Sequence, residues 1–278
     1  MAGLGDTTAF LKQVRKYADA GMSGSAGPTR CREVSDFGEN PGGLRMLAYA
    51  PVGLPAGAPL VVTLHGCTQY GEAYAAGAGW LDLADRLGFA VLAPEQVQGN
   101  NPSRCFNWFS SEDVRRGGGE VCSIANMIAA MVRDHHLDPD QVFITGLSAG
   151  GAMTAAMLAA YPELFAGGAI IAGLPYGSAA TLPDALKVMQ SGDGRSSAVL
   201  SELVRKAAPA SKRPLRLSIW HGDADHTVHP SNGRDLAKQW TAAHGLKGAG
   251  ETIGHDGYNR QTWTGRSVVA VRPQKAAI

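Results

Sequence analysis

A predicted strand, a glycine-flanked serine and a predicted helix follow one another directly, and this succession constrains the fold more than any other part of the chain. Residues 142–145 are β-branched or aromatic, which is typical of a strand buried on both faces. Gly146, Ser148 and Gly150 match the pattern G-x-S-x-G, and residues 152–160 are rich in helix-forming alanine, leucine and methionine. A serine at such a sharp turn has a strained backbone and is exposed at the carboxyl end of the strand. The pattern therefore predicts a nucleophile elbow with Ser148 at its apex.

Strand and helix patterns alternate around this element. Further strands are predicted at residues 44–50, 60–64, 89–93, 167–172, 215–220 and 267–271, and further helices at 80–87, 123–132 and 197–207. Such alternation implies right-handed crossovers and a mostly parallel sheet with helices on both faces. Without an internal repeat or an interior linker, one α/β domain over residues 31–278 is the economical interpretation. An amphipathic helix and a loop are expected to precede it, over residues 1–30.

Composition narrows the class of partner. Apolar residues make up 45% of the chain, charged residues 18%, and the formal net charge is +1, so neither nucleic acid nor anionic lipid is an expected partner. No apolar run approaches the roughly 20 residues of a membrane span. A small or oligomeric, near-neutral substrate fits better. The first ten residues lack the basic start and apolar core of a secretory signal, which predicts a cytoplasmic protein or one that is already processed, and the retained Met1 favours the first.

The four cysteines are too few for a fold built on disulfides, and they lack the spacing of metal ligands. We therefore expect neither a metal nor another cofactor. Cysteines in such a chain can still form one or two bridges. Cys67 and Cys105 are the predicted pair, because both lie in loops at the expected active-site edge of the sheet.

The acid that supports Ser148 is expected at a later strand end. A serine hydroxyl needs a histidine to take its proton and an acid to orient that histidine, and on this arrangement the chain order is serine, acid, histidine. Asp223 and Asp225 both follow the strand predicted at 215–220. In the spacing His-Gly-x-x-Asp-x-x-Val, Asp225 lies in the loop and Val228 returns to the core, so we prefer Asp225 and assign Asp223 an ordinary turn role.

The loop at residues 65–69, which follows an earlier strand, is predicted to provide the oxyanion hole. Gly66 would let the backbone turn tightly, so that the amide of Cys67 faces the site, and the amide of Ala149 would be the second donor. Cys67 is thus expected to act through its backbone, because nothing near it in sequence would lower the pKa of its thiol.

Five motifs together resemble those of the polyhydroxybutyrate depolymerase-type esterases, which are α/β-hydrolases related to feruloyl and acetylxylan esterases. The motifs are His-Gly-Cys-Thr-Gln at 65–69, Cys-Phe-Asn-Trp-Phe at 105–109, Arg-Gly-Gly-Gly-Glu at 116–120, the elbow at 146–153 and His-Gly-Asp-Ala-Asp at 221–225. The resemblance spans about residues 44–265. It implies an α/β-hydrolase catalytic domain with Ser148 as nucleophile, Asp225 as triad acid and the Cys67 amide in the oxyanion hole.

The same resemblance implies that Asn107 and Trp108 lie near the mouth of the substrate pocket. On physical grounds alone, Trp108 with its flanking aromatic residues in a long loop fits a core position equally well.

The catalytic histidine is where the chain departs from the family pattern. In the family this residue lies in a Gly-His-Ala-Trp-like turn after the last strand, which corresponds here to residues 267–271, and no histidine follows. The sequence leaves open whether the domain is incomplete at this end or has diverged. His255 is the candidate substitute, although in family terms it matches a loop before the last strand.

Hydrolysis of carboxylic esters through an acyl-enzyme is the leading interpretation, with short polyhydroxyalkanoate chains or acyl esters of plant sugars as substrates. The alternative is a non-catalytic α/β-hydrolase-fold binding protein, because the triad histidine is not found. A peptidase is a weaker interpretation, since nothing marks a pocket for a peptide terminus. The oligomeric state is open.

Overall fold

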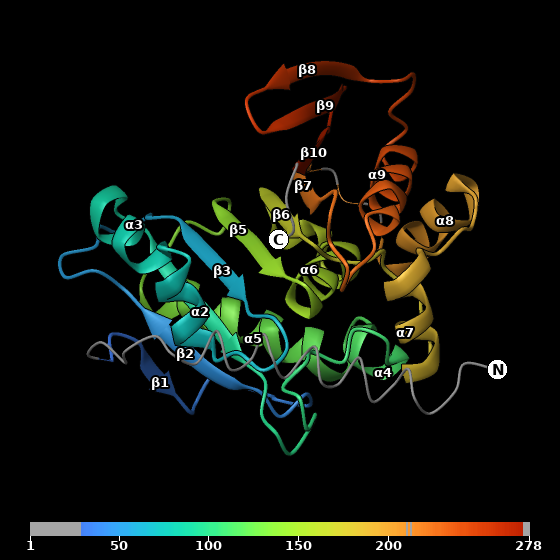
Figure 1. The fold of residues 1–278 in the computed structure, drawn as a ribbon. Helices are drawn as coiled ribbons and strands as arrows, with labels where there is room; N and C mark the ends of the chain where they lie inside the picture. The colour runs from blue at the N-terminus through green and yellow to red at the C-terminus, as the bar shows by residue number, and fades with distance from the viewer. Residues whose placement is uncertain (1–28, 210, 212, 275–278) are drawn as a thin grey trace.

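A computed structural model describes residues 29–209, 211 and 213–274, and its centre is a ten-stranded sheet (Figure 1). The strands are β1 (Arg32–Val34), β2 (Arg45–Tyr49), β3 (Leu60–Leu64), β4 (Ala90–Glu95), β5 (Val142–Leu147), β6 (Gly167–Ile171), β7 (Arg216–Gly222), β8 (Glu251–His255), β9 (Tyr258–Thr264) and β10 (Val268–Gln274). Their spatial order is β1-β2-β4-β3-β5-β6-β7-β10-β9-β8. The N-terminal helix expected before residue 30 lies outside the described residues.

The centre of the sheet is parallel and its two ends are antiparallel. Strands β4, β3, β5, β6, β7 and β10 run in one direction. At one end β2 and β1 pair antiparallel, and at the other end β9 and β8 do the same. The carboxyl ends of β3, β5 and β7, which precede the predicted functional loops, therefore meet at one edge of the sheet.

Helices follow the central strands and cover the sheet. They are α2 (Gly71–Gly77), α3 (Trp80–Leu87), α4 (Ser111–Val114), α5 (Gly119–Asp134), α6 (Ala149–Ala160), α7 (Leu182–Ser191), α8 (Ser197–Ala207) and α9 (Ser231–Ala243), with a 3-10 turn at Pro162–Leu164. Helix α6 is buried along its whole length, as its alanine-rich sequence allows.

Two apolar clusters lie on opposite faces of the sheet, and alternate residues of β3 point into them. Leu60, Val62 and Leu64 belong to the larger cluster with α5 and α6, whereas Val61 belongs to the smaller cluster with α2 and α3. This alternation follows from the two-residue period of a strand. Because both faces are covered, every residue of β3 is buried, which explains its uninterrupted apolar sequence.

The structure confirms the predicted α/β class and differs from the sequence interpretation mainly in the last 30 described residues. The sequence interpretation has His255 in a loop before the last strand, yet β8 and β9 form a hairpin there and His255 is the last residue of β8. Every residue of β8 is exposed, so the segment lacks the apolar alternation by which a strand is recognised. Figure 1 shows this hairpin at one end of the sheet, away from the helices.

Candidate active site

Ser148 occupies a strained turn between β5 and α6. Its backbone angles are φ 54° and ψ −117°, a conformation that L-residues rarely adopt and that costs on the order of 1–3 kcal/mol. The amide of Ser148 donates to the carbonyl of Ile171, the last residue of β6, at 2.9 Å, and its carbonyl accepts from the amide of Ala152 at 2.9 Å. These two hydrogen bonds hold the turn in its strained conformation. The predicted nucleophile elbow is therefore present.

The loop after β3 lies against this elbow. A Cβ built on Gly66 would be 3.5 Å from the Leu147 carbonyl and 3.7 Å from the Cβ of Ser148. In the described part of the chain, the amides of Cys67 and Ala149 donate to no acceptor, so both are free for an oxyanion. Thr68 has a left-handed backbone in this loop, with φ 67°, and Gly66 is the residue that lies close to the elbow.

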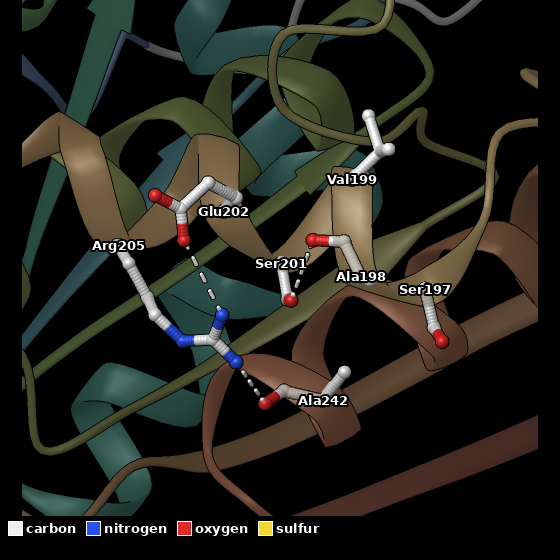
Figure 2. A pocket seen from close by; sticks show the side chains of 7 residues that line it. All are labelled: Ser197, Ala198, Val199, Ser201, Glu202, Arg205 and Ala242. Atoms are coloured by element: carbon white, nitrogen blue, oxygen red, sulfur yellow. Dashed lines mark hydrogen bonds and ion pairs between the residues drawn. The ribbon is translucent and has the colours of Figure 1, made fainter.

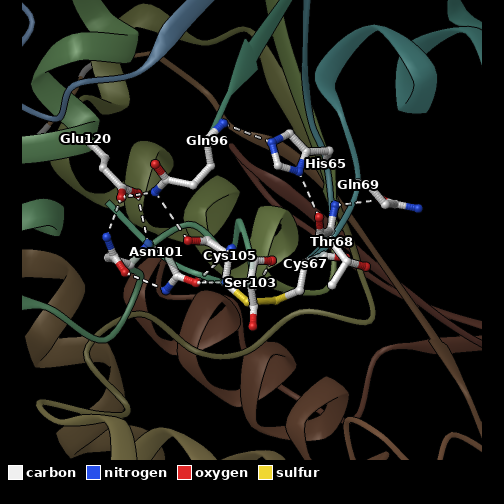
Figure 3. The surroundings of a disulfide bond; sticks show 11 residues. His65, Cys67, Thr68, Gln69, Gln96, Asn101, Ser103, Cys105 and Glu120 are labelled. Carbon is white, nitrogen blue, oxygen red and sulfur yellow. Dashed lines mark hydrogen bonds between the residues drawn. A yellow bond between two sulfur atoms is a disulfide. The ribbon is translucent and has the colours of Figure 1, made fainter. Parts of the chain in front are cut away.

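The predicted disulfide between Cys67 and Cys105 is confirmed, with a Cα–Cα distance of 4.2 Å (Figure 3). The disulfide joins the loop of residues 65–69, called here the oxyanion loop, to the long loop between β4 and α4. Beside it, the amide of Thr68 donates to the carbonyl of Ser103 at 2.7 Å. The thiol of Cys67 is thereby consumed, which leaves only its backbone for catalysis. Cys31 and Cys122 are free.

Asn107 and Trp108 lie in the loop tethered by this disulfide. The side chain of Asn107 donates to Glu120 and accepts from Asn101, both at 2.9 Å, so its polar atoms are engaged within the protein. Trp108 is 6% exposed, belongs to the larger core cluster and packs edge-on against Phe109. Both residues therefore support the loop, and their contact with substrate stays a prediction.

Glu120, in the first turn of α5, is fully buried beneath the same loop. Its carboxyl group accepts hydrogen bonds from the amide and side chain of Asn107 and from the side chain of Gln96. Burial, together with nearby Asp113, outweighs these donors and raises the pKa of Glu120 to about 8. The carboxyl group is thus largely protonated at neutral pH.

A pH-dependent stability follows from this raised pKa. The folded state binds the proton of Glu120 more tightly than the unfolded chain, so the stabilisation is complete below the ordinary pKa of 4.5 and is lost as pH rises to about 8. Each pH unit in this window changes the free energy of unfolding by about 1.4 kcal/mol. We expect the wild type to lose stability relative to Glu120→Gln between about pH 6 and pH 8 in urea titrations. Parallel pH profiles for the two proteins would contradict the raised pKa.

Asp225 is buried in the loop after β7, whereas Asp223 is exposed, which supports the choice between them. Its Oδ1 accepts from the amides of Thr227 and Val228, both at 2.9 Å. Val228 is buried, as the spacing predicted. Among the described residues, only His221 lies within ion-pair distance of Oδ2, with its Nε2 at 3.7 Å. This Nε2 donates instead to the Val228 carbonyl at 2.7 Å. One oxygen of Asp225 is therefore left to orient another group.

All eight histidines lie within the described residues, and none of them joins Asp225 to Ser148. Only His221 is within ion-pair distance of the Asp225 carboxylate, and burial lowers its pKa. Both ring nitrogens of His65 are engaged, Nδ1 with the Gly66 carbonyl and Nε2 with the Gln96 amide. His229 bonds Ser231, and His226 is exposed beside Asp225.

The order of strands places His255 far from the elbow. It ends β8, which is five strand positions from β5, and neighbouring strands are about 4.8 Å apart, which gives roughly 24 Å along the sheet. A histidine side chain cannot span that distance. His255 instead stacks on Tyr258 with ring centroids 4.6 Å apart, and Tyr258 contacts Trp220.

Replacing His255 by alanine should therefore leave esterase activity within about twofold of the wild type. Because His255 is exposed, stability should change by no more than about 0.5 kcal/mol. Initial rates on an activated acetyl ester check this expectation, and a collapse of the rate would show that His255 reaches Ser148.

Two hollows on the described surface lie apart from Ser148, Cys67 and Asp225. One, of about 600 Å³, lies over α8 and the end of α9 (Figure 2). There Arg205 pairs with Glu202 and donates to the carbonyl of Ala242, so the charged groups are already engaged.

Among the described residues there is no cluster of side chains suited to hold a metal ion, and no helix long and apolar enough to cross a membrane.

Comparison with known proteins decides the family. A family model described as esterase PHB depolymerase matches residues 46–260. This chain belongs to that family. The match contains the elbow, the oxyanion loop, both disulfide cysteines and Asp225, and it ends before β10.

Relatives within the esterase PHB depolymerase family carry two kinds of name. The chain is 46% identical over 215 residues to poly(3-hydroxyalkanoate) depolymerase C of Paucimonas lemoignei, which covers 77% of this chain and 52% of the depolymerase. It is 34% identical over 222 residues to acetylxylan esterase A of Aspergillus oryzae, with 77% and 71% covered. The chain thus spans about half the length of the depolymerase.

A solved structure supports the same assignment. The acetyl xylan esterase from Aspergillus awamori matches with a TM-score of 0.81 and 27% identity, over 88% of this chain and 93% of that one. The family and the α/β-hydrolase fold indicated by the five motifs are confirmed, and the named relatives are carboxylic ester hydrolases. The roles of individual residues stay predictions.

Proposed function

We propose that this chain hydrolyses carboxylic esters through an acyl-enzyme on Ser148. The strained elbow carries the proposal, because it presents Ser148 beside two free amides, those of Cys67 and Ala149. In the proposed reaction the Ser148 oxygen attacks the ester carbonyl, its proton passes to a base, and the two amides stabilise the oxyanion. The alcohol then leaves, and water releases the acid from Ser148.

The general base in this proposal is not one of the histidines as they are arranged here. Asp225 keeps Oδ2 available to orient such a base. Strand β10 runs parallel to β7, and Gln274 at its end pairs with Gly222, which precedes the loop that holds Asp225. Residues 275–278 contain no histidine. A triad without its base retains its oxyanion hole and exceeds the rate in water by roughly 10³ to 10⁴, so the 278-residue chain should be a weak esterase.

Esters of hydroxyalkanoates are the proposed substrate class. The identity of 46% to the depolymerase exceeds the 34% to the acetylxylan esterase, and the near-neutral chain suits an uncharged ester. The test compares release of acid from 3-hydroxybutyrate oligomers and from acetylated xylo-oligosaccharides, with Ser148→Ala as the blank. Faster Ser148-dependent release from the oligomers supports the proposal, and preference for the acetylated sugar contradicts it.

We also propose that the protein works in an oxidising compartment. The Cys67–Cys105 disulfide supports this, because such bonds persist outside the cytosol and are rare within it. The cytoplasmic location expected from the first ten residues is the competing possibility. Mass spectrometry of the native protein after alkylation of free thiols distinguishes the two, since only a cytosolic protein should carry alkyl groups on Cys67 and Cys105.

A further inference from the structure

A chain of buried polar contacts runs from α5 to the oxyanion loop (Figure 3). Glu120 accepts a hydrogen bond from the side chain of Gln96, and the backbone amide of Gln96 donates to Nε2 of His65 at 3.0 Å. Nδ1 of His65 contacts the carbonyl oxygen of Gly66 at 2.7 Å. All three side chains are fully buried. The proposed reaction uses none of them directly.

The tautomer of His65 follows from its two partners. An amide N–H can only donate, so Nε2 must accept from Gln96 and the ring proton must be on Nδ1. Nδ1–H then donates to the Gly66 carbonyl. Burial lowers the pKa of His65 to about 4, so the ring is neutral at neutral pH and Nε2 remains an acceptor. The ring of Phe106 packs against the ring of His65 at a tilt of 41°, with centroids 4.8 Å apart.

This contact helps to set the orientation of the Cys67 amide, together with the amide of Gln69, which donates to the same Gly66 carbonyl at the longer distance of 3.3 Å. The carbonyl of Gly66 and the N–H of Cys67 belong to one planar peptide and point in opposite directions. When His65 holds the carbonyl oxygen, the N–H of Cys67 must point away from His65. The preceding peptide is held as well, because the amide of Gly66 donates to the side chain of Gln69 at 2.8 Å.

A second branch holds the partner of Cys67. The side chain of Gln96 also donates to the carbonyl of Cys105 at 3.2 Å, and the disulfide passes this restraint to Cys67. Glu120 accepts from the amide of Asn107 at 2.9 Å in the same loop. Both chains of contacts therefore end at the carboxyl group of Glu120.

We infer that Glu120, Gln96 and His65 are positioning residues that fix the Gly66–Cys67 peptide, so that the Cys67 amide meets the oxyanion formed at Ser148. The inference rests on the proposed function. None of the three touches the substrate. Their contribution is made before the reaction begins, because an amide that is already oriented needs no rearrangement as charge develops.

The test uses His65→Phe, which keeps an aromatic ring against Phe106 and removes the donor to Gly66. Misplacing one oxyanion donor should lower kcat about 10- to 100-fold with KM within about twofold, because the donor acts mainly on the transition state. Rates are measured on an activated acetyl ester with imidazole added as a base. Glu120→Gln should also lower kcat with little change in KM, but by a smaller factor. His244→Phe is the matched control, since His244 is a half-buried histidine bonded to Ser267 away from the elbow, and it should keep kcat unchanged.

The possible outcomes separate the two proposals. A rate that Ser148→Ala removes but His65→Phe leaves unchanged overturns the positioning role and keeps the proposed function. A rate that Ser148→Ala does not affect overturns the proposed function and this inference with it. If His65→Phe folds poorly, a crystal structure of Glu120→Gln decides: a shifted Gly66–Cys67 peptide supports the inference, and an unmoved peptide with full kcat overturns it.

Discussion

Replacing Gly150 by alanine should destabilise the protein by at least about 3 kcal/mol and abolish its activity. A Cβ at this position would lie 2.1 Å from the carbonyl oxygen of Leu64 and 2.5 Å from that of His65. Both atoms belong to the backbone at the end of β3, so α6 and β3 would have to separate. Overpacking of side chains costs about 1–3 kcal/mol, and a clash with backbone costs more. Because Ala149 and Ser148 precede Gly150, the oxyanion hole would be displaced at the same time.

Urea denaturation followed by circular dichroism measures this effect. Gly77→Ala is the matched control, because Gly77 is also in a helix, and a Cβ there would meet nothing within 4 Å. Alanine at that position should leave stability unchanged or raise it by up to about 1 kcal/mol. Equal unfolding midpoints for Gly150→Ala and the wild type would show that α6 does not approach β3 this closely.

Removing the disulfide should lower both stability and turnover. Cys67 and Cys105 are 38 positions apart, and in the chain-entropy model closing a loop of this length stabilises the native state by about 4 kcal/mol. The double variant Cys67→Ser with Cys105→Ser keeps the amide at position 67 but loses its tether. We therefore expect a lower midpoint of denaturation and a reduced kcat for the folded fraction.

Cys122→Ser provides the control for this change, because Cys122 is a free, half-buried cysteine in α5. It should alter stability by less than about 1 kcal/mol. A reducing agent should lower the midpoint of the wild type to that of the double variant and leave the double variant unaffected. A wild type that is indifferent to reduction would contradict the stabilising role of the bridge.

Local signals were sufficient to predict the elbow and the buried position of Asp225, whose role as triad acid stays a prediction. The run from Val142 to Ala160 combines a strand, a glycine-flanked serine and a helix, and each part is dictated by nearby residues. The choice of Asp225 over Asp223 depended on the return of Val228 to the core, and the burial of both residues agrees with it. Fold class followed from the alternation of strands and helices.

Contacts between distant segments could not be predicted in the same way. Glu120 lies in the first turn of α5, where an acidic residue ordinarily faces solvent and stabilises the helix N-terminus. Its burial depends on Gln96 and Asn107, which come from the loop after β4. His65 was recognised as part of a motif, but its role depends on the amide of Gln96, which follows the neighbouring strand β4. No periodic pattern in the sequence carries that information.

The hairpin of β8 and β9 was missed for a different reason. Its outer strand is exposed along its length, so burial imposes no alternation on its side chains. Its register is held by β9 and β10, through pairs such as His255 with Tyr258 and Gln274 with Tyr258. The distance of His255 from Ser148 follows from the order of the strands, which the sequence alone did not reveal.

Imidazole supplied in solution tests the assignment of Ser148 and Asp225 most directly. If the base is the missing member of the triad, a free imidazole can accept the proton of Ser148 while Asp225 orients it. The measurement is the initial rate of hydrolysis of an activated acetyl ester against imidazole concentration. It is made for the wild type, Ser148→Ala and Asp225→Asn, with Ser148→Ala correcting for imidazole acting on the ester alone.

We predict a weak rate for the wild type without imidazole and a saturable rise with it. Ser148→Ala should show no rise above the reaction of imidazole with the ester alone. For Asp225→Asn, the imidazole-dependent rise in rate should be at least about tenfold smaller than for the wild type. A wild-type rate equal to that of Ser148→Ala at every imidazole concentration would contradict the assignment of Ser148 as nucleophile. Vigorous turnover without imidazole, unchanged by His255→Ala, would show that another histidine of this chain serves as the base.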